Sequence, residues 1–305
     1  KMVDTLIEKI IALQNPTCVG LDTSFEYLPD EMRSGVQTFE EAANRITEFN
    51  KNIIDKVSDV VPAVKVQIAY YEMYGEYGLK SFKNTLVYAK QKGLTVIADC
   101  KRNDIGSTAS CYAKAFLGET QLNGEKLKSF PADMLTVNGY LGSDGILPFI
   151  DEIKACGKSI FVLVKTSNPS SGELQNLKLE SGEYVYERMG RLVEEWGRDT
   201  VGKYGYSEVG AVVGATHPEE AENLRGKLKN TFFLIPGYGA QGGSAAMLKV
   251  CFDKRGLGGI VNNSRGIICA YKKPEYSNKT YAEAARAASI AMQKDLSSAI
   301  GKMGK

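Results

Sequence analysis

Asp99, Lys101 and Asp104 place two carboxylates and one ammonium group within a short stretch of the chain. The stretch closes an apolar run, Thr95–Asp99, of the kind that forms a buried strand. Because side chains alternate along a strand, Asp99 and Lys101 are predicted to share one face, with Cys100 pointing into the core on the other. A carboxylate beside an ammonium keeps both groups ionised. Such fixed charges could stabilise charge that develops on a bound molecule.

Lys65, within the strand-like run Ala63–Gln67, could join Asp104 in extending this group to an alternating array of two cations and two anions. A structural ion-pair network is the alternative interpretation, and an Asp-x-Lys pair alone favours it. The longer string Ala-Asp-Cys-Lys-Arg-Asn-Asp-Ile-Gly-Ser-Thr, from Ala98 to Thr108, favours a functional site instead.

Eight strand-like runs alternate with longer amphipathic segments along the chain. This alternation indicates parallel strands joined by right-handed crossovers. Eight units favour an α/β fold, a (β/α)8 TIM barrel forming one domain over residues 1–305, and an open doubly wound sheet is the alternative. The predicted strands are Thr17–Leu21, Ala63–Gln67, Thr95–Asp99, Met134–Asn138, Ser159–Lys165, Glu208–Val213, Phe232–Pro236 and Gly258–Asn262, and the helical patterns include Glu40–Lys56, Tyr184–Tyr204, Pro218–Leu228 and Ala282–Ile300.

Two connections, Leu117–Pro131 and Ser167–Gly182, are longer than a barrel needs. Long loops in compact domains are often lids over a site, although plain surface excursions are as common. Both interpretations stay open for Leu117–Pro131, and a lid is favoured for Ser167–Gly182 because it directly follows a strand end. Thr216 and Glu219 fit a capping box at the start of the next helix, which leaves His217 as a loop residue.

The composition is that of an ordinary globular protein, with 43% hydrophobic and 24% charged residues. A net charge of +2 gives no reason to expect nucleic acid or an anionic membrane as a partner. No signal peptide or membrane-length apolar run is evident. Six scattered cysteines and one histidine make a zinc site implausible and favour a reducing, cytoplasmic setting. Lys1 precedes Met2 and is expected to be a remnant of expression.

A glycine-rich loop follows the seventh predicted strand from Pro236 and Gly237 onward, and its N–H groups could approach an anion. Gln241 within it can donate from its amide, and Arg265, one strand later, offers a fork suited to phosphate. Barrels commonly bind phosphate after strands seven and eight, at the carboxyl ends where their sites lie. The other polar or glycine residues near these strand ends are Asp22, Lys65, Thr166, Ser167, Gly239 and Gly266.

Together these motifs resemble the orotidine 5′-phosphate decarboxylase family in its longer, type 2 form. The family's Asp-x-Lys-x-x-Asp-Ile-x-x-Thr stands here as Asp99, Lys101, Asp104, Ile105 and Thr108. The insertion at 117–131 lies outside the shorter family pattern. The resemblance also covers, in barrel order, Leu21-Asp22, the strand of Lys65, Lys165–Pro169, Gly214–Thr216, Ile235–Gly243 and Asn263–Gly266.

The resemblance implies decarboxylation of orotidine 5′-monophosphate to uridine 5′-monophosphate (UMP), a carboxy-lyase step of pyrimidine biosynthesis that uses no cofactor and no metal. Loss of CO2 leaves a C6 carbanion whose lone pair lies in the ring plane, so the ring cannot delocalise it. A fixed ammonium can stabilise or protonate such a carbanion. By resemblance, Lys101 delivers the proton, and Asp99 lies against the departing carboxylate and holds Lys101.

The resemblance also implies the substrate contacts. Lys65 would bridge Asp99 and the ribose, and Asp22 would bind the ribose hydroxyls. The pyrimidine edge would meet Ser167 or Thr166. The protein would be a homodimer with shared active sites, in which Asp104 and Thr108 serve the neighbouring subunit. Further implied contacts are Ile105, Pro236, Gly237, Gly239, Gln241, Arg265 and Gly266.

Two alternative functions stay open. A Mg²⁺-dependent hexulose-phosphate-type lyase or decarboxylase of the same barrel superfamily would need a further carboxylate near the first strand. There Thr23 follows Asp22, and the next acid is Glu26. A catalytically silent nucleotide-binding protein is the other alternative, and the intact acid–lysine string argues against it.

Overall fold

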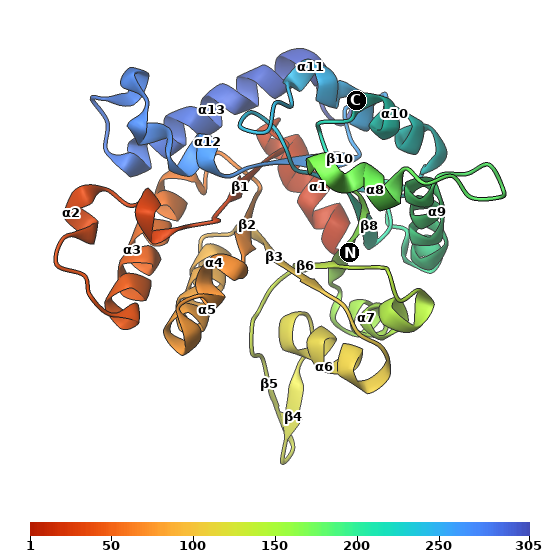
Figure 1. Cartoon of the computed structure of the whole chain (residues 1–305), viewed down its shortest axis with the longest axis horizontal. Coiled ribbons are helices and arrows are strands. Elements are labelled where there is room, and N and C mark those ends of the chain that lie inside the picture. Colours follow the sequence, from red (N-terminus) through yellow and green to blue (C-terminus); the bar gives the residue numbers. More distant parts are fainter.

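Eight short apolar strands pair in parallel and close into a barrel (Figure 1). In this computed structural model, which describes residues 1–305, the order around the barrel is β1-β2-β3-β6-β7-β8-β9-β10 and back to β1. The predicted (β/α)8 barrel is confirmed, and the open sheet is excluded. The strands are β1 Thr17–Gly20, β2 Ala63–Gln67, β3 Thr95–Arg102, β6 Met134–Val137, β7 Ser159–Lys165, β8 Val209–Val213, β9 Phe233–Ile235 and β10 Gly259–Asn263.

Helices connect the strands and surround the barrel (Figure 1). None of them is long and apolar enough to cross a membrane. They are α1 Met2–Leu13, α2 Asp30–Arg33, α3 Phe39–Val57, α4 Ala69–Glu72, α5 Gly75–Gln91, α6 Gly106–Phe116, α7 Ser143–Cys156, α8 Gly172–Gln175, α9 Val185–Gly197, α10 Pro218–Lys227, α11 Ala245–Leu248, α12 Arg265–Ile268 and α13 Tyr281–Ile300.

The amino-terminal end of the barrel is closed by α1. Its Leu6 and Ile10 are buried in one cluster with Met134 and Phe161 of the strands. Lys9 of the same helix donates to the start of β3. Apolar side chains therefore fill the barrel interior near the amino-terminal ends of the strands. Polar groups lie at the carboxyl ends.

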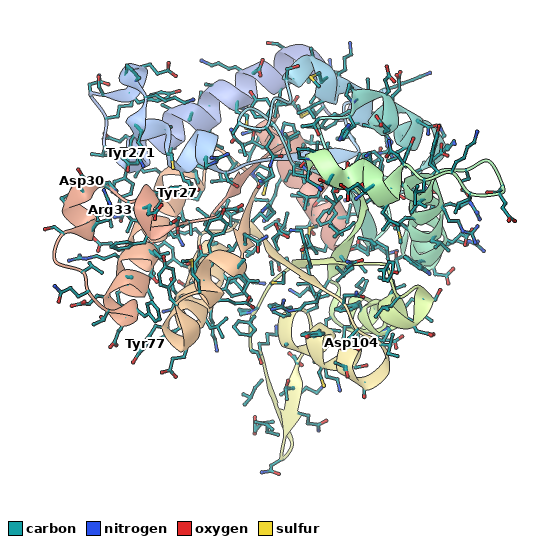
Figure 2. The ribbon with its side chains drawn as sticks, viewed as in Figure 1. Tyr27, Asp30, Arg33, Tyr77, Asp104 and Tyr271 are labelled. Atoms are coloured by element: carbon teal, nitrogen blue, oxygen red, sulfur yellow. The ribbon has the colours of Figure 1, made fainter.

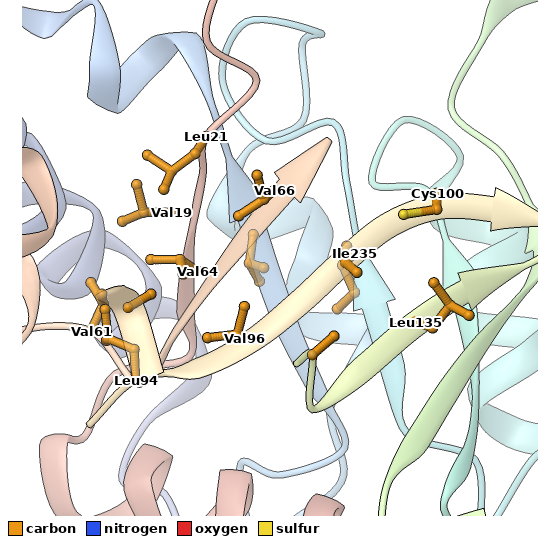
Figure 3. Close-up of a cluster of buried hydrophobic side chains, with 14 of the residues drawn as sticks. Val19, Leu21, Val61, Val64, Val66, Leu94, Val96, Cys100, Leu135 and Ile235 are labelled. Carbon is orange, nitrogen blue, oxygen red and sulfur yellow. The ribbon is translucent and has the colours of Figure 1, made fainter. Parts of the chain in front are cut away.

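Alternation along the strands separates this inner core from an outer one. On β2, Val64 and Val66 belong to the large cluster between barrel and helices, whereas Ala63 belongs to the inner cluster. Figure 3 shows this outer layer, in which Leu135 from β6 also lies. The same alternation turns Lys65 toward the barrel interior, where it is 4% exposed.

Two local predictions were wrong. The helix predicted over Tyr184–Tyr204 ends at Gly197, where the backbone comes so close to Ser207 that a Cβ would clash. The predicted capping box at Thr216 is absent, because His217 is the N-cap and makes no side-chain capping bond. The Thr216 hydroxyl instead donates to the carbonyl oxygen of Ser167 at 3.1 Å and ties two strand ends together.

The two long connections differ in structure. Residues 117–131 contain an exposed hairpin, β4 Thr120–Leu122 and β5 Glu125–Leu127, which projects away from the barrel (Figure 1). Residues 167–182 contain a short 3₁₀ turn, Pro169–Ser171, and then α8. The buried ammonium of Lys165 donates to Ser171 Oγ at 2.9 Å and fastens the base of this second segment.

Candidate active site

A polar pocket of about 600 Å³ opens at the carboxyl ends of the strands. It combines charged groups on one side with a glycine-containing loop on the other. Its lining includes Asp22, Lys65, Asp99, Lys101, Thr136, Thr166, Ser167, Pro236, Gly237, Gln241 and Arg265.

Charged groups from three neighbouring strands form a continuous array. Lys65 Nζ lies 2.8 Å from Asp99 Oδ2 and 3.4 Å from Asp22 Oδ1. Lys101 Nζ lies 2.8 Å from Asp99 Oδ1. An array of two cations and two anions therefore exists within one chain. Its second anion is Asp22, whereas the sequence pattern suggests Asp104 in that role.

Every pKa shift resolved in this array favours the charged form. Burial alone would raise the pKa of Asp99, but the ammonium groups of Lys65 and Lys101 hold it well below its usual range. Burial alone would lower the pKa of Lys65, but the carboxylates of Asp22 and Asp99 raise it above its ordinary value. The pocket therefore holds a buried carboxylate and ammonium that stay ionised at neutral pH.

Lys101 reaches this array through an irregular backbone. Its φ is 48°, in the left-handed region, and the pairing of β3 with β6 shifts register between Ala98 and Arg102. A non-glycine residue in this region costs about 1–3 kcal/mol, and such residues cluster at functional sites. Asp99 and Lys101 are thus in contact, as the alternation of side chains predicts. The strand between them is not regular, because a bulge interrupts its pairing with β6. Cys100 is buried in the outer core, as predicted.

Thr136 was missed by sequence reasoning although it lines the pocket. Its Oγ1 lies 2.7 Å from Asp99 Oδ1 and accepts the backbone N–H groups of Cys100 and Lys101, each at 3.0 Å. The signal available in the sequence was a single polar residue inside the apolar run Met134–Val137.

The end of β7 supplies two hydroxyls to the pocket. Ser167 Oγ donates to Gln241 Oε1 at 2.8 Å and so links this strand end to the glycine-rich loop. Thr166 is engaged elsewhere, because its hydroxyl accepts from Gln175 Nε2 at 2.7 Å and donates to Asn168 Oδ1 at 2.6 Å. The two residues are therefore not equivalent, and Ser167 is the one joined to the opposite wall.

The glycine-rich loop has the backbone that its composition suggests. Gly237 and Gly239 have φ values of 96° and 72°, which favour glycine. Gly239 and Gly266 line an adjoining cavity of about 750 Å³, and Arg265 borders both cavities. The exposed Arg265 thus stands at the rim, where it could meet an anion.

Asp104, Ile105 and Thr108 lie outside the pocket of their own chain. The Asp104 carboxylate accepts the N–H of Ile105 at 2.8 Å, and Ile105 is 51% exposed. Thr108 is exposed on α6, beside which Figure 2 marks Asp104. In this structure these three residues therefore do not line the pocket that Lys101 of the same chain lines.

Comparison with known proteins adds to this geometry. Residues 16–281 match the model of the orotidine 5′-phosphate decarboxylase / HUMPS family. The chain belongs to this family. A family member from Clostridium acetobutylicum named orotidine 5′-phosphate decarboxylase is 44% identical over 296 residues, which cover 97% of this chain and 98% of that protein. A second protein of the same name, from Caldicellulosiruptor saccharolyticus, is 42% identical over 302 residues. The match covers 97% of this chain and 98% of that protein.

The fold of the decarboxylase family extends over the chain. The solved OMP decarboxylase of Leishmania donovani superposes with a TM-score of 0.74 at 27% identity, and the match covers 98% of each chain. The barrel, the charge array and the glycine-rich loop thus lie on a scaffold that the family shares.

Proposed function

We propose that this protein removes CO2 from orotidine 5′-monophosphate to give UMP, a step of pyrimidine biosynthesis. The observation that carries the proposal is the ammonium of Lys101, held 2.8 Å from the buried carboxylate of Asp99 at the edge of a nucleotide-sized pocket. Family membership and relatives named for this reaction support it.

In the proposed reaction, the bond between C6 and the carboxylate breaks, and its electron pair stays on C6. The fixed ammonium of Lys101 stabilises this in-plane charge and transfers a proton to C6. Lys101 is left as an amine and regains a proton from water. Asp99 orients Lys101 and lies beside the leaving carboxylate, while Lys65 keeps Asp99 charged.

We assign the rest of the substrate to the walls of the pocket. The ribose hydroxyls meet Asp22 and Lys65, and the pyrimidine edge meets Ser167. Backbone N–H groups of the loop from Gly237 and the fork of Arg265 take the phosphate. Binding at this remote end supplies energy to the chemical step and helps close residues 167–182 as a lid.

We further propose a homodimer in which each chain completes the partner's pocket with Asp104, Ile105 and Thr108. Exposed apolar side chains support it, because Tyr140 is 74% exposed and Leu141 43%. Backbone at Asp104 and the side chain of Leu141 both lie close to α7, so these groups share one surface.

Residues 1–305 are proposed to act as one barrel domain without a cofactor. All six cysteines are free, which supports a reducing, cytoplasmic setting.

Absorbance at wavelengths where orotidine 5′-monophosphate and UMP differ tests the function directly. Rapid conversion in excess chelator supports a metal-free decarboxylase. Conversion that needs added Mg²⁺ would favour the lyase type, and tight UMP binding without CO2 release in a single turnover would indicate a silent binding protein.

A further inference from the structure

Thr136 in β6 joins two features of the site that are otherwise separate. Its side chain is inside the barrel and only 1% exposed. On one side it contacts the carboxylate of Asp99, and on the other it contacts the backbone that carries Lys101. One hydroxyl therefore touches both the counter-ion of the proposed proton donor and the chain segment that places this donor.

The direction of each hydrogen bond follows from the atoms involved. A hydroxyl oxygen has two lone pairs and one proton. The N–H groups of Cys100 and Lys101 occupy the lone pairs, each at 3.0 Å. The proton is left for Asp99 Oδ1, at 2.7 Å. The hydroxyl is thus fully used, and its single donor stabilises the ionised form of Asp99.

The two N–H groups lie where regular pairing of β3 with β6 is interrupted. Buried backbone donors need an acceptor, and a bulge removes the regular ladder carbonyls. Thr136 supplies one acceptor for both donors. The left-handed conformation of Lys101, with φ 48°, is therefore held by a side chain of the neighbouring strand.

Asp99 is held at three points as a result. Its Oδ1 accepts from Thr136 at 2.7 Å and from Lys101 Nζ at 2.8 Å, and its Oδ2 accepts from Lys65 Nζ at 2.8 Å. Without the hydroxyl, the Oδ1 atom would be held by the long, partly exposed Lys101 side chain alone. Both ends of the Lys101 residue, its backbone and its ammonium, would then gain freedom.

We infer that Thr136 is a positioning residue, which locks the β3 bulge and the Asp99 carboxylate together and thereby aims the Lys101 ammonium at the reacting carbon. The inference rests on the proposed decarboxylation. A misplacement of about 1 Å at a reacting group costs on the order of 100-fold in rate, so a small loss of order is enough to be measured.

Thr136→Val keeps the branched shape and removes the hydroxyl, whereas Thr136→Ser keeps the hydroxyl. Thr95→Val is the matched control, because Thr95 is an equally buried threonine at the opposite end of β3. We expect Thr136→Val to lower kcat by about 10- to 100-fold, the scale of a hydrogen bond to a charged group. Thr136→Ser and Thr95→Val should stay within about threefold of wild type, which is about 0.7 kcal/mol.

Two further readouts separate positioning from loss of stability. UMP has no C6 carboxylate and is bound mainly at its other end, so its Kd should change little in Thr136→Val. The loss in Thr136→Val should instead fall on kcat, with the KM for orotidine 5′-monophosphate changing by less than about threefold. If the valine variant is insoluble, Thr136→Ala carries the same test.

Wild-type kcat in Thr136→Val, or a loss carried by KM alone, would overturn the inference. So would equal kcat losses in the serine and valine variants that follow the loss in Tm, because these would indicate a packing role. Wild-type protein that cannot decarboxylate orotidine 5′-monophosphate would instead overturn the proposed function, and this inference with it.

Discussion

The ammonium nitrogen of Lys101 lies 2.8 Å from Oδ1 of Asp99, yet the Lys101 side chain is 45% exposed while that of Asp99 is 8% exposed. The buried carboxylate thus holds a cation that faces the open pocket. A cation in this position can reach a bound molecule without first breaking a buried contact, which is what transfer of a proton to substrate requires.

Lys101→Ala should abolish turnover and leave the fold intact. No other ammonium has this access to the pocket, so kcat should fall by about 10⁴-fold or more, the upper range for loss of a general acid. Asp99 keeps its buried partner Lys65 and the lost Lys101 side chain is 45% exposed, so Tm should move by a few degrees at most. Decarboxylation rate and thermal unfolding should be measured together.

Lys126→Ala, in the exposed hairpin, is the matched control and should retain full activity. Near-normal turnover in Lys101→Ala would remove Lys101 from the reaction.

Asp99→Asn should destabilise the protein by about 3 kcal/mol at pH 7, because it breaks a buried ion pair on one side only. The native pKa of Asp99 is lowered below the value of about 3.9 in the unfolded chain. Its ionised form therefore contributes fully above the unfolded pKa, and this contribution is lost as pH falls toward the native pKa. The stability gap between wild type and variant should narrow below about pH 4.

Urea unfolding between pH 3 and 7 measures this gap. Asp151→Asn, an exposed aspartate on α7, should track wild type at every pH. A gap that does not depend on pH would mean that Asp99 is not held ionised by its neighbours.

Strand positions were predictable because a short apolar run bounded by polar and turn residues is a local signal in the sequence. The bulge at Lys101 was not, because it exists only where β3 meets the Thr136 hydroxyl of β6. The capping boxes show the same limit. Thr280 with Glu283 forms one, whereas the similar pair at Thr216 does not, because that hydroxyl bonds to a distant strand end.

Residues at the strand ends could be expected near one pocket, because a parallel barrel brings all of its carboxyl ends together. Sequence gave no way to choose between Thr166 and Ser167. That difference arises from Gln175, which turns back from α8 to bind Thr166 and leaves Ser167 to face Gln241.

Arg265→Ala should weaken binding of UMP about 10- to 100-fold and binding of uridine hardly at all, because its fork can contact only the phosphate. Calorimetric titration of both ligands gives the two losses. Arg45→Ala, on the exposed face of α3, is the control and should change neither. Equal losses for nucleotide and nucleoside would place Arg265 away from the phosphate.

Limited digestion with trypsin should distinguish the two long connections. Lys178 is exposed in residues 167–182, and Lys126 is exposed in the hairpin. If the first segment closes over bound nucleotide and the second is a surface excursion, UMP should slow cleavage at Lys178 and leave cleavage at Lys126 unchanged. Uridine, which lacks the phosphate, should protect less. Equal rates at Lys178 with and without UMP would contradict closure.

The position of Asp104 leads to a test of shared active sites. Asp104 follows the end of β3 and lies outside its own pocket, so a two-fold dimer could present it to the partner's Lys101. Lys101→Ala and Asp104→Ala subunits should each be inactive as pure dimers. In a mixed dimer one site carries both lesions, and the other has an intact Lys101 and an intact Asp104.

Random exchange gives about half mixed dimers, each with one repaired site, so about a quarter of wild-type activity should reappear on mixing. Subunit exchange is followed independently with two different affinity tags, and mixing Lys101→Ala with itself is the control. Activity that stays absent although exchange is demonstrated would mean that Asp104 acts on the Lys101 of its own chain. That result would require the segment after β3 to move, because in this structure the Asp104 carboxylate accepts the N–H of Ile105 and does not line the pocket.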